Sequence, residues 1–223
     1  MIRGDKVLAL IPARKGSTRL PQKNMRSFNG KPLIHWSIDA AIHSKYIDDV
    51  CLSTDCDEMM NYFSTQTGRK LPLRPTELAT SNSPSTSTID YVIEHYADDA
   101  KWIMLLQPTS PLRSVEDIDR SIEWTVYKNA KSCISVTEFK KNINWLYAIK
   151  DEKFCSPFDH KIEDKIFIMN GALYFFNISW YMEKRILKDQ NTLAFIMPEE
   201  RSIDIDEESE LILAEFWAKQ KNR

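Results

Sequence analysis

An uninterrupted run of apolar residues near the N-terminus, Val7-Leu8-Ala9-Leu10-Ile11, constrains the fold most. A strand with one wet face alternates apolar and polar side chains, so a continuous run predicts a strand buried on both faces. Such strands belong to parallel sheets that helices cover on both sides. The run ends at Pro12 and is too short for the apolar core of a signal peptide or for a membrane span.

Similar segments recur along the first 130 residues, separated by stretches whose apolar residues recur every three or four positions. The expected strands are 7–11, 49–54, 71–73 and 102–107, and the expected helices are 32–44, 57–67 and 87–96. Strand–helix alternation predicts a Rossmann-like, three-layer α/β/α fold with a mainly parallel sheet. A chain of 223 residues is long enough for one such domain, so residues 1–223 are expected to form a single unit.

The pattern changes from residue 132 onward. Short strand-like segments at 133–136, 145–149, 166–168 and 172–176 follow one another without long helices, which predicts an antiparallel insertion or a projecting hairpin. Residues 140–168 are rich in Phe, Trp and Ile, and we expect this insertion to join two copies into a homodimer. The last helix should bury an apolar face made of Leu211, Leu213, Ala214, Phe216 and Trp217.

Charge and cysteine content narrow the class of protein. The formal net charge is −2, so there is no overall basic field to hold nucleic acid non-specifically. The four cysteines are scattered, without zinc-ligand spacing, and are expected to be free, buried thiols in a reducing compartment. We therefore expect a cytoplasmic protein that binds neither nucleic acid nor membrane.

The loop that follows the first strand, 13–24, combines one glycine, two hydroxyl side chains and four cations. Ligands of open α/β sheets bind beyond the carboxyl ends of the strands, which is where this loop begins. Its backbone N–H groups and hydroxyls, with Arg14 and Lys23, suit a triphosphate. It lacks the GKS/T ending of a P-loop and the GxGxxG of a dinucleotide site, and the plain alternative is a solvated basic loop.

Two carboxylates alternate in the segment Ser202-Ile203-Asp204-Ile205-Asp206. Period-two geometry turns both aspartates to one side, where they repel unless a cation lies between them. Hard oxygen ligands suit Mg²⁺, so the pair is a candidate metal site. The alternative is that Asp206 caps the last helix.

Three further positions are of interest because they lie at the expected ends of strands or helices. Gln107 ends an apolar strand and either points into the site or is an ordinary strand-end residue. Asn170-Gly171 alone is typical of a turn. Arg113, at an expected helix start, is assigned to a structural ion pair rather than to an anion site.

Five collinear stretches, covering nearly the whole chain, resemble the acylneuraminate cytidylyltransferases, the enzymes that make CMP-sialic acids. They are IPARKGSTRLPQKN (11–24), STDCDE (53–58), LRPTELATSNSPS (73–85), LLQPTSPLR (105–113) with NGALYFF (170–176), and SIDID (202–206). The resemblance implies a nucleotidyltransferase fold, a homodimer and Mg²⁺ as cofactor.

The resemblance also implies residue roles. The CTP phosphates would contact Arg14, Ser17, Lys23 and Asn24, and the cytosine and ribose would contact Arg74, Ser83 and Ser85. Gln107 and Asn170 would contact the sugar, and Asp204 and Asp206 would hold Mg²⁺. Arg14, Lys23 and Asp206 would carry catalysis, with Asp206 helping to activate the sugar hydroxyl.

The chain departs from the family pattern in three places. Thr18-Arg19 replaces a common Lys-Gly pair and resembles the related Kdo cytidylyltransferases. Ser81 replaces a usual Asp, and Pro84 interrupts an Ala-Ser-Ser step. Ile168-Met169 replaces an Arg-Pro whose arginine helps to hold the sugar carboxylate, so either the acceptor differs or a lysine does that work: Lys140, Lys141 or Lys165.

The expected reaction transfers CMP from CTP to the anomeric hydroxyl of a sialic-acid-like, nine-carbon nonulosonic acid and releases pyrophosphate. The alternatives are a cytidylyltransferase for another 3-deoxy-2-ulosonic acid (legionaminic, pseudaminic or Kdo) and a catalytically silent nucleotide-binding homologue. Intact Arg14, Lys23, Asp204 and Asp206 argue against the silent protein, which has no need of paired carboxylates.

Overall fold

A six-stranded sheet in the order β10-β6-β9-β5-β1-β4 organises the chain. The computed structural model describes residues 1–80, 83–155 and 164–221. The strands are β1 (Lys6–Pro12), β4 (Asp49–Ser53), β5 (Ala100–Leu105), β6 (Ser132–Glu138), β9 (Phe167–Asn177) and β10 (Leu193–Ile196). All run parallel except β9, which pairs antiparallel with β5 and β6, so the predicted mainly parallel sheet is confirmed.

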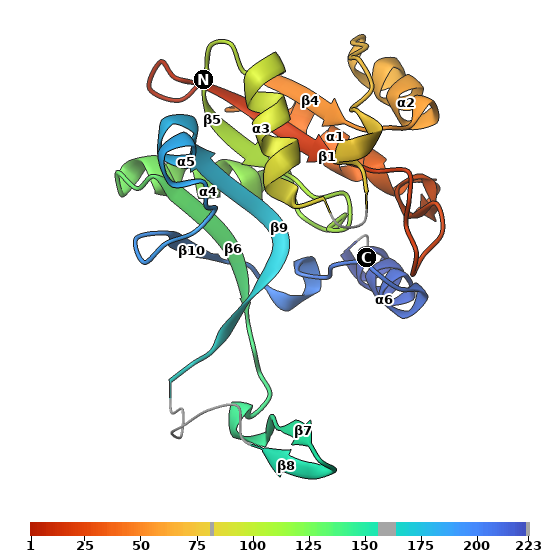
Figure 1. Ribbon diagram of the computed structural model, residues 1–223, viewed down its shortest axis with the longest axis vertical. Helices are drawn as coiled ribbons and strands as arrows, with labels where there is room; N and C mark the ends of the chain where they lie inside the picture. Colours follow the sequence, from red (N-terminus) through yellow and green to blue (C-terminus); the bar gives the residue numbers. More distant parts are fainter. Residues whose placement is uncertain (81–82, 156–163, 222–223) are drawn as a thin grey trace.

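Helices cover both faces of this sheet (Figure 1). Helices α1 (Leu33–His43), α2 (Asp57–Thr67) and α4 (Val115–Tyr127) pack on one face, and α3 (Ser85–Tyr96) and α5 (Ile178–Lys184) pack on the other. The apolar run of β1 explains why both layers form. Alternate side chains of this strand, such as Ala9 and Leu10, belong to the cores on opposite faces, and every residue from Val7 to Ile11 is buried. The predicted three layers are confirmed.

Helix α6 (Glu208–Lys221) lies outside the two main layers and closes a third apolar cluster. Leu211, Ala214 and Ala218 are buried there against the start of α1 and the short strand β2 (Ser27–Phe28). The predicted face was partly wrong, because Leu213 and Phe216 are exposed. Residues three, four and seven apart share a helix face, and that spacing joins residues 211, 214 and 218.

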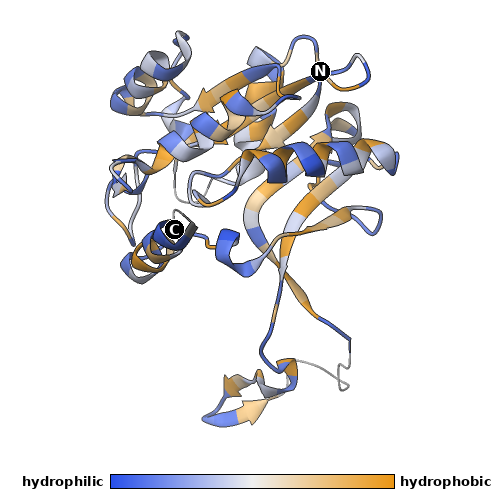
Figure 2. Ribbon diagram, turned by 180° about the vertical axis from the view of Figure 1, so that it is seen from behind, coloured by the Kyte–Doolittle hydropathy of each residue, from blue (hydrophilic) through white to orange (hydrophobic). Residues whose placement is uncertain are grey.

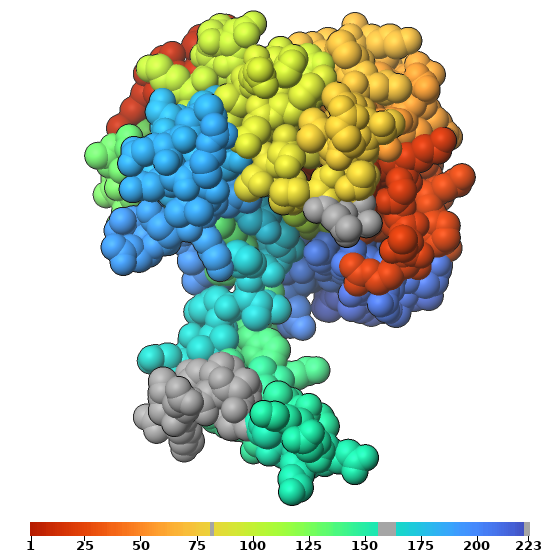
Figure 3. Space-filling model, in the orientation of Figure 1, coloured from red at the N-terminus to blue at the C-terminus, as the bar shows by residue number. Residues whose placement is uncertain are grey.

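Strands β6 and β9 run on past the sheet as a two-stranded arm (Figures 1 and 3). The arm carries the 3₁₀ turn η3 (Ile143–Trp145) and the hairpin of β7 (Ala148–Lys150) and β8 (Lys153–Cys155), so the predicted antiparallel projection is present. Residues 156–163 of the expected insertion lie outside the described part. Figure 2 shows hydrophobic colour along the central strands and also in this part of the arm, where Trp145 of η3 and Phe154 of β8 are each 77% exposed.

Several sequence-based boundaries were wrong for local reasons. Residues 71–73 are irregular, because the chain bends toward the site as Arg74 N–H donates to the carbonyl of Thr54 at 2.7 Å. The strands expected at 166–168 and 172–176 are one strand, β9. The expectations named neither β10 nor α5, and for α4 they gave only a helix start near Arg113. Helix α4 begins with a capping box in which Ser114 and Asp117 each accept a backbone N–H from the other.

Two expectations about environment can be compared with the described residues. No helix among them is both long and apolar enough to cross a bilayer, and the longest, α6, has 14 residues. Cys51, Cys56 and Cys133 are free and buried, as predicted, while Cys155 on the arm is half-buried.

Candidate active site

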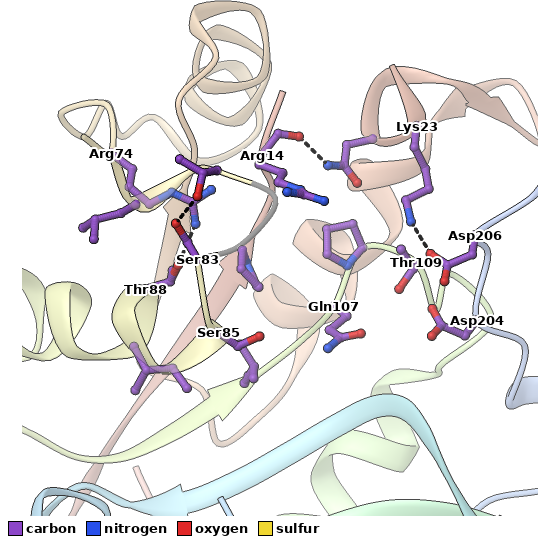
Figure 4. Close-up of a pocket in the computed structure, with 17 residues that line it drawn as sticks. Arg14, Lys23, Arg74, Ser83, Ser85, Thr88, Gln107, Thr109, Asp204 and Asp206 are labelled. Carbon is purple, nitrogen blue, oxygen red and sulfur yellow. Dashed lines mark hydrogen bonds and ion pairs between the residues drawn. The ribbon is translucent and has the colours of Figure 1, made fainter. Parts of the chain in front are cut away.

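A cavity of about 380 Å³ opens where the parallel strands β1 and β5 end. Every site residue predicted from the sequence lines it except Ser17 and Asn170. Figure 4 shows these side chains converging from four separate segments of the chain. The predicted residues that line the cavity are Arg14, Lys23, Asn24, Arg74, Ser83, Ser85, Gln107, Asp204 and Asp206.

The loop after β1 is anchored so that its cations reach the cavity. The buried Asn24 side chain donates through Nδ2 to the carbonyl of Arg14 at 3.1 Å, which ties the two ends of the loop together. Leu20 anchors the middle of the loop in the cluster beneath α6. Arg14 and Lys23 therefore line the cavity from a fixed loop, whereas Ser17 lies on a part of it that does not.

Asp204 and Asp206 lie in the irregular segment between the 3₁₀ turn η4 (Glu199–Arg201) and α6. This segment is not a β-strand, but the predicted alternation holds, since Ile205 is buried while both aspartates line the cavity. The Ile205 N–H donates to the carbonyl of Thr109 at 2.8 Å. The segment is thereby fixed against the loop that follows β5.

Helix α6 is not capped by the Asp206 carboxylate. Instead the Glu210 carboxylate accepts the backbone N–H groups of Asp206 at 2.7 Å and Glu207 at 2.9 Å. The side chain of Asp206 is thereby left to face the cavity. The alternative role as a helix cap, left open by the sequence, is wrong for this carboxylate.

The two aspartates have opposite electrostatic environments. Burial would raise the pKa of Asp206, but the ion pairs with Lys23 (Nζ–Oδ1, 2.7 Å) and Arg19 (Nη2–Oδ2, 2.5 Å) outweigh it and hold this pKa below its ordinary value. Burial raises the pKa of Asp204. The nearby Thr109 hydroxyl opposes this shift in pKa, although neither it nor the buried Oδ1 of Asp204 has a partner at full hydrogen-bond geometry among the described residues.

These carboxylates fit part of a magnesium site. Asp204 offers an oxygen without a partner, and Asp206 lies two residues away on the same cavity wall. Within residues 1–80, 83–155 and 164–221, no group of three or more His, Cys, Asp or Glu side chains could enclose a metal ion. Mg²⁺ in phosphate-transfer sites often takes one or two carboxylates and completes its shell with phosphate and water oxygens. The donor set suits that arrangement.

Gly171 brings the backbone of β9 close to this pair. Its φ is +74°, and a Cβ placed there would lie 3.1 Å from Oε1 of Gln107 and 3.3 Å from Oδ2 of Asp204. The alternative of a turn at Asn170-Gly171 does not hold, because both residues lie inside β9. The two residues form a bulge inside one strand, where the pairing register of β6 with β9 shifts between Ile134 and Val136. Glycine is required here by both conformation and space.

Arg113 stabilises the β9 bulge and the loop after β5. It is buried, and it donates to the carbonyl of Ala172 at 2.8 Å, the carbonyl of Gln107 at 3.3 Å and Oγ of Ser37 at 2.6 Å. The predicted ion pair is wrong, because the described residues place no carboxylate within salt-bridge distance of Arg113. Its guanidinium instead ties the β9 bulge, the loop after β5 and helix α1 together.

The other end of the cavity is built by Arg74 and the start of α3. Arg74 is buried, and its Nη1 donates to Oγ1 of Thr88 at 2.8 Å, while burial lowers its pKa. Ser83 donates to the carbonyl of Glu77 at 2.9 Å. Pro84, at the N-cap of α3, makes no side-chain hydrogen bond to the first turn. This wall offers a guanidinium and hydroxyls but no carboxylate among its described residues; Ser81 lies outside them.

A family model described as "Cytidylyltransferase" matches residues 8–161 of the chain. The chain belongs to this family. The match contains the loop after β1, the Arg74 region, and the strand and loop that carry Gln107.

Curated relatives agree with the family assignment. The chain is 34% identical to the CMP-N,N'-diacetyllegionaminic acid synthase of Legionella pneumophila over 90% of this chain and 91% of that protein. It is 31% identical to an N-acylneuraminate cytidylyltransferase of Streptococcus agalactiae serotype V over 93% of this chain. That alignment covers 52% of the relative, so the chain spans about half the length of that curated protein.

A solved structure agrees in fold. The CTP complex of CMP:2-keto-3-deoxy-manno-octonic acid synthetase superposes with a TM-score of 0.72 over 97% of this chain and all of that one, at 15% identity. At that identity, the likeness shows the fold alone. It confirms the predicted nucleotidyltransferase architecture.

Asn170 lies away from the cavity lining. It is buried, its Oδ1 accepts from Oγ of Ser135 at 2.5 Å, and its Nδ2 donates to Oγ of Ser202 at 2.8 Å. It therefore fixes the β9 bulge to the segment that leads to Asp204. A contact between Asn170 and the sugar stays a prediction, because both of these hydrogen bonds hold the Asn170 side chain to other protein groups.

None of the three lysines proposed to hold a sugar carboxylate lines the cavity. Lys140 pairs with Glu199 at 2.6 Å, and Lys165 pairs with Glu138 at 3.2 Å, both at the base of the arm. Four residues at the site were assigned no role from the sequence: Arg19, Thr88, Thr109 and Gly171. The long-range pairing of Arg19 with Asp206, 187 residues apart, has no local signal.

Proposed function

We propose that this chain transfers CMP from CTP to the anomeric hydroxyl of a sialic-acid-like nonulosonic acid and releases pyrophosphate. The observation that carries the proposal is the pairing of a cationic loop with two carboxylates, Asp204 and Asp206, across one cavity at the ends of β1 and β5. Membership of the cytidylyltransferase family and the printed activities of the relatives support it.

The cationic groups would bind the triphosphate and stabilise its developing charge. Arg14 and Lys23 line the cavity from a loop fixed by Asn24, so their charges need little reorganisation when the phosphates arrive. An in-line displacement at the α-phosphorus needs positioning and positive charge more than covalent chemistry. Mg²⁺, held by Asp204 and Asp206 together with phosphate oxygens, would supply further positive charge.

Asp206 would orient the metal and, directly or through one water, help to deprotonate the sugar hydroxyl. Its pKa lies below the ordinary value despite its burial, because of Lys23 and Arg19, so it is a carboxylate at neutral pH. The pKa of Asp204 is shifted in the opposite direction, above its ordinary value, because this carboxylate is buried.

The wall of Arg74, Ser83 and Ser85 is the candidate site for the nucleoside. Cytosine presents an N4 donor together with O2 and N3 acceptors, so its selection over uracil requires a donor and an acceptor placed together. Arg74 offers donors, and the Thr80, Ser83 and Ser85 hydroxyls that line the same wall can act as acceptors. Ser83 and Ser85 supply hydroxyl groups within reach of the ribose side of the cavity.

The acceptor class is a nonulosonic acid, with N-acylneuraminate as the first candidate. The two relatives described above act, by their printed names, on N-acylneuraminate and on N,N'-diacetyllegionaminic acid. The departures at Thr18-Arg19 and Ile168-Met169 leave legionaminic, pseudaminic and Kdo acceptors as alternatives.

A pyrophosphate-release assay with CTP, Mg²⁺ and a panel of these acids tests the activity and names the acceptor. One acid should support release far above the others. CTP binding without release from any acid would instead favour the catalytically silent homologue.

Asp206→Ala is the matched variant for this assay. It should bind CTP but lose nearly all turnover. Retention of more than a tenth of the wild-type kcat, equivalent to losing less than about 1.4 kcal/mol of barrier stabilisation, removes Asp206 from the mechanism.

We further propose that the chain acts as a cytoplasmic homodimer joined through the arm. The support is the apolar character of the arm that projects from the body (Figure 3), where Trp145 of η3 and Ile149 and Phe154 of the β7–β8 hairpin are exposed. Large exposed apolar side chains gathered in one place are typical of protein interfaces.

A further inference from the structure

Both carboxylate oxygens of Asp206 are occupied by cations from the loop after β1. Lys23 Nζ lies 2.7 Å from Oδ1, and Arg19 Nη2 lies 2.5 Å from Oδ2. The backbone N–H of Asp206 donates to the Glu210 carboxylate in the first turn of α6, which holds the Asp206 backbone in place. A further cation, whether a metal ion or a proton, would meet a carboxylate whose charge Lys23 and Arg19 already neutralise.

We propose that Arg19 is a nucleotide-responsive cation: without CTP it occupies Oδ2 of Asp206, and the triphosphate of CTP withdraws it and opens that oxygen to the metal. This inference rests on the proposed function for the identity of the nucleotide. It assigns to Arg19 a role in assembling the site, and it makes the binding of nucleotide and of divalent metal interdependent.

The exposures of the two cations identify which one moves. The side chain of Lys23 is 13% exposed and belongs to the cavity wall, whereas that of Arg19 is 60% exposed. An exposed arginine can reorient at small cost, because most of its surface is already solvated. Arg19 is therefore the cation that exchanges, and Lys23 is the one that stays.

The direction of the exchange follows from charge. A triphosphate carries several negative charges and many acceptor oxygens, and guanidinium binds phosphate in bidentate geometry. One carboxylate with a single short contact to Arg19 competes poorly with such a ligand. Once Arg19 moves, Oδ2 of Asp206 is open to a metal ion in the cavity that Asp204 also lines.

Coupling between the two ligands must then be positive and reciprocal. CTP raises the affinity for the metal by removing a competing cation, and the metal raises the affinity for CTP by the same factor. In the protein without nucleotide, Arg19 and the metal compete for one oxygen. Replacing Arg19 by a neutral residue should thus raise the affinity for the metal and lower the affinity for the nucleotide.

The test measures each ligand alone on the purified protein with Arg19→Ala. Mn²⁺ binding without nucleotide, followed by the EPR signal of free Mn²⁺, should tighten by roughly fivefold or more, the lower end of typical coupling between sites. CTP binding by calorimetry in the presence of EDTA should weaken. Arg19→Gln should behave in the same way. A merely structural role for Arg19 would weaken both ligands, so opposite signs are the diagnostic result.

Arg26→Ala is a matched control, because Arg26 pairs with Glu208 of α6 at 2.5 Å and does not line the cavity. It should change neither affinity. In an Asp206→Asn background, Arg19→Ala should no longer tighten Mn²⁺ binding.

Unchanged or weaker Mn²⁺ binding by the nucleotide-free Arg19→Ala protein overturns the inference. That readout needs neither CTP nor an acceptor. If the wild type fails to bind CTP, the proposed function fails separately.

Discussion

Replacing Gly171 by alanine perturbs the closest backbone approach in the site. Gly171 lies in the β9 bulge with φ +74°, beneath Gln107 and Asp204. The change adds one methyl group and removes no polar atom, so its effects arise from conformation and space alone. Both can be worked out from the structure.

The conformational penalty comes first. A left-handed backbone costs a residue with a Cβ about 1–2 kcal/mol, and the loss of glycine's freedom in the unfolded chain returns about 0.4–1 kcal/mol. The net destabilisation from conformation is therefore about 1 kcal/mol. The added Cβ would also lie 3.1 Å from Oε1 of Gln107 and 3.3 Å from Oδ2 of Asp204, and overpacking of this kind typically adds about 1–3 kcal/mol.

Gly68→Ala separates the two contributions. Gly68 ends α2 with φ +71°, but nothing lies within 4 Å of the Cβ it would gain. It should show only the conformational loss of about 1 kcal/mol, while Gly171→Ala loses about 2–4 kcal/mol. Urea unfolding of both variants, compared by their midpoints at equal slopes, measures the difference.

The site should respond only to Gly171→Ala. Displacement of Asp204 or Gln107 by a few tenths of an ångström toward 1 Å should lower kcat by about tenfold to a hundredfold, measured as pyrophosphate release where both variants remain folded. If Gly171→Ala and Gly68→Ala are equally stable and equally active, the close approach of Gly171 to Gln107 and Asp204 does not affect stability or activity, and the reasoning is refuted.

Two further predictions concern stability and assembly. Asp117→Asn should destabilise the protein by about 1–3 kcal/mol at pH 7, because the buried Asp117 carboxylate accepts two hydrogen bonds from Arg201 at 2.8 Å and caps α4. Burial alone would raise the pKa of Asp117, but Arg201 and Ser114 together lower it from 3.8, so its contribution is present above pH 3.8 and is lost as pH falls through the folded-state value. The gap between the urea midpoints of wild type and variant should thus be constant above pH 3.8 and narrow as the pH falls below 3.8, and a gap that does not narrow there would contradict this account. Replacing Trp145 and Phe154 by serine should convert a dimer to a monomer near 26.0 kDa in light scattering, while Tyr127→Ser, at an exposed aromatic on α4, should not; a monomeric wild type would contradict the dimer.

The sheet could be predicted from the sequence because burial leaves a direct pattern. The run from Val7 to Ile11 and the segment around Trp102 are continuous and apolar, and both became central parallel strands. Strand β10 is a short edge strand whose residues alternate between half-buried and exposed, so it carries no comparable pattern.

The site was predictable where function requires residue types at fixed local spacing. Asp204 and Asp206 were correctly expected to share one side, although their segment is irregular rather than a strand. Contacts between distant segments left no such signal. The pairing of Arg19 with Asp206 and the hydrogen bonds of Arg113 to backbone carbonyls depend on tertiary structure alone.

The phosphorus chemistry of the products tests the central claim most directly. Incubation with CTP, Mg²⁺ and the best acid of the panel, followed by ³¹P NMR, should replace the three CTP resonances by one phosphodiester resonance and the resonance of pyrophosphate. Both should appear together, in equal amounts and only when the acid is present. Formation of CDP and inorganic phosphate, or of pyrophosphate with free CMP, would contradict transfer of the cytidylyl group to the sugar.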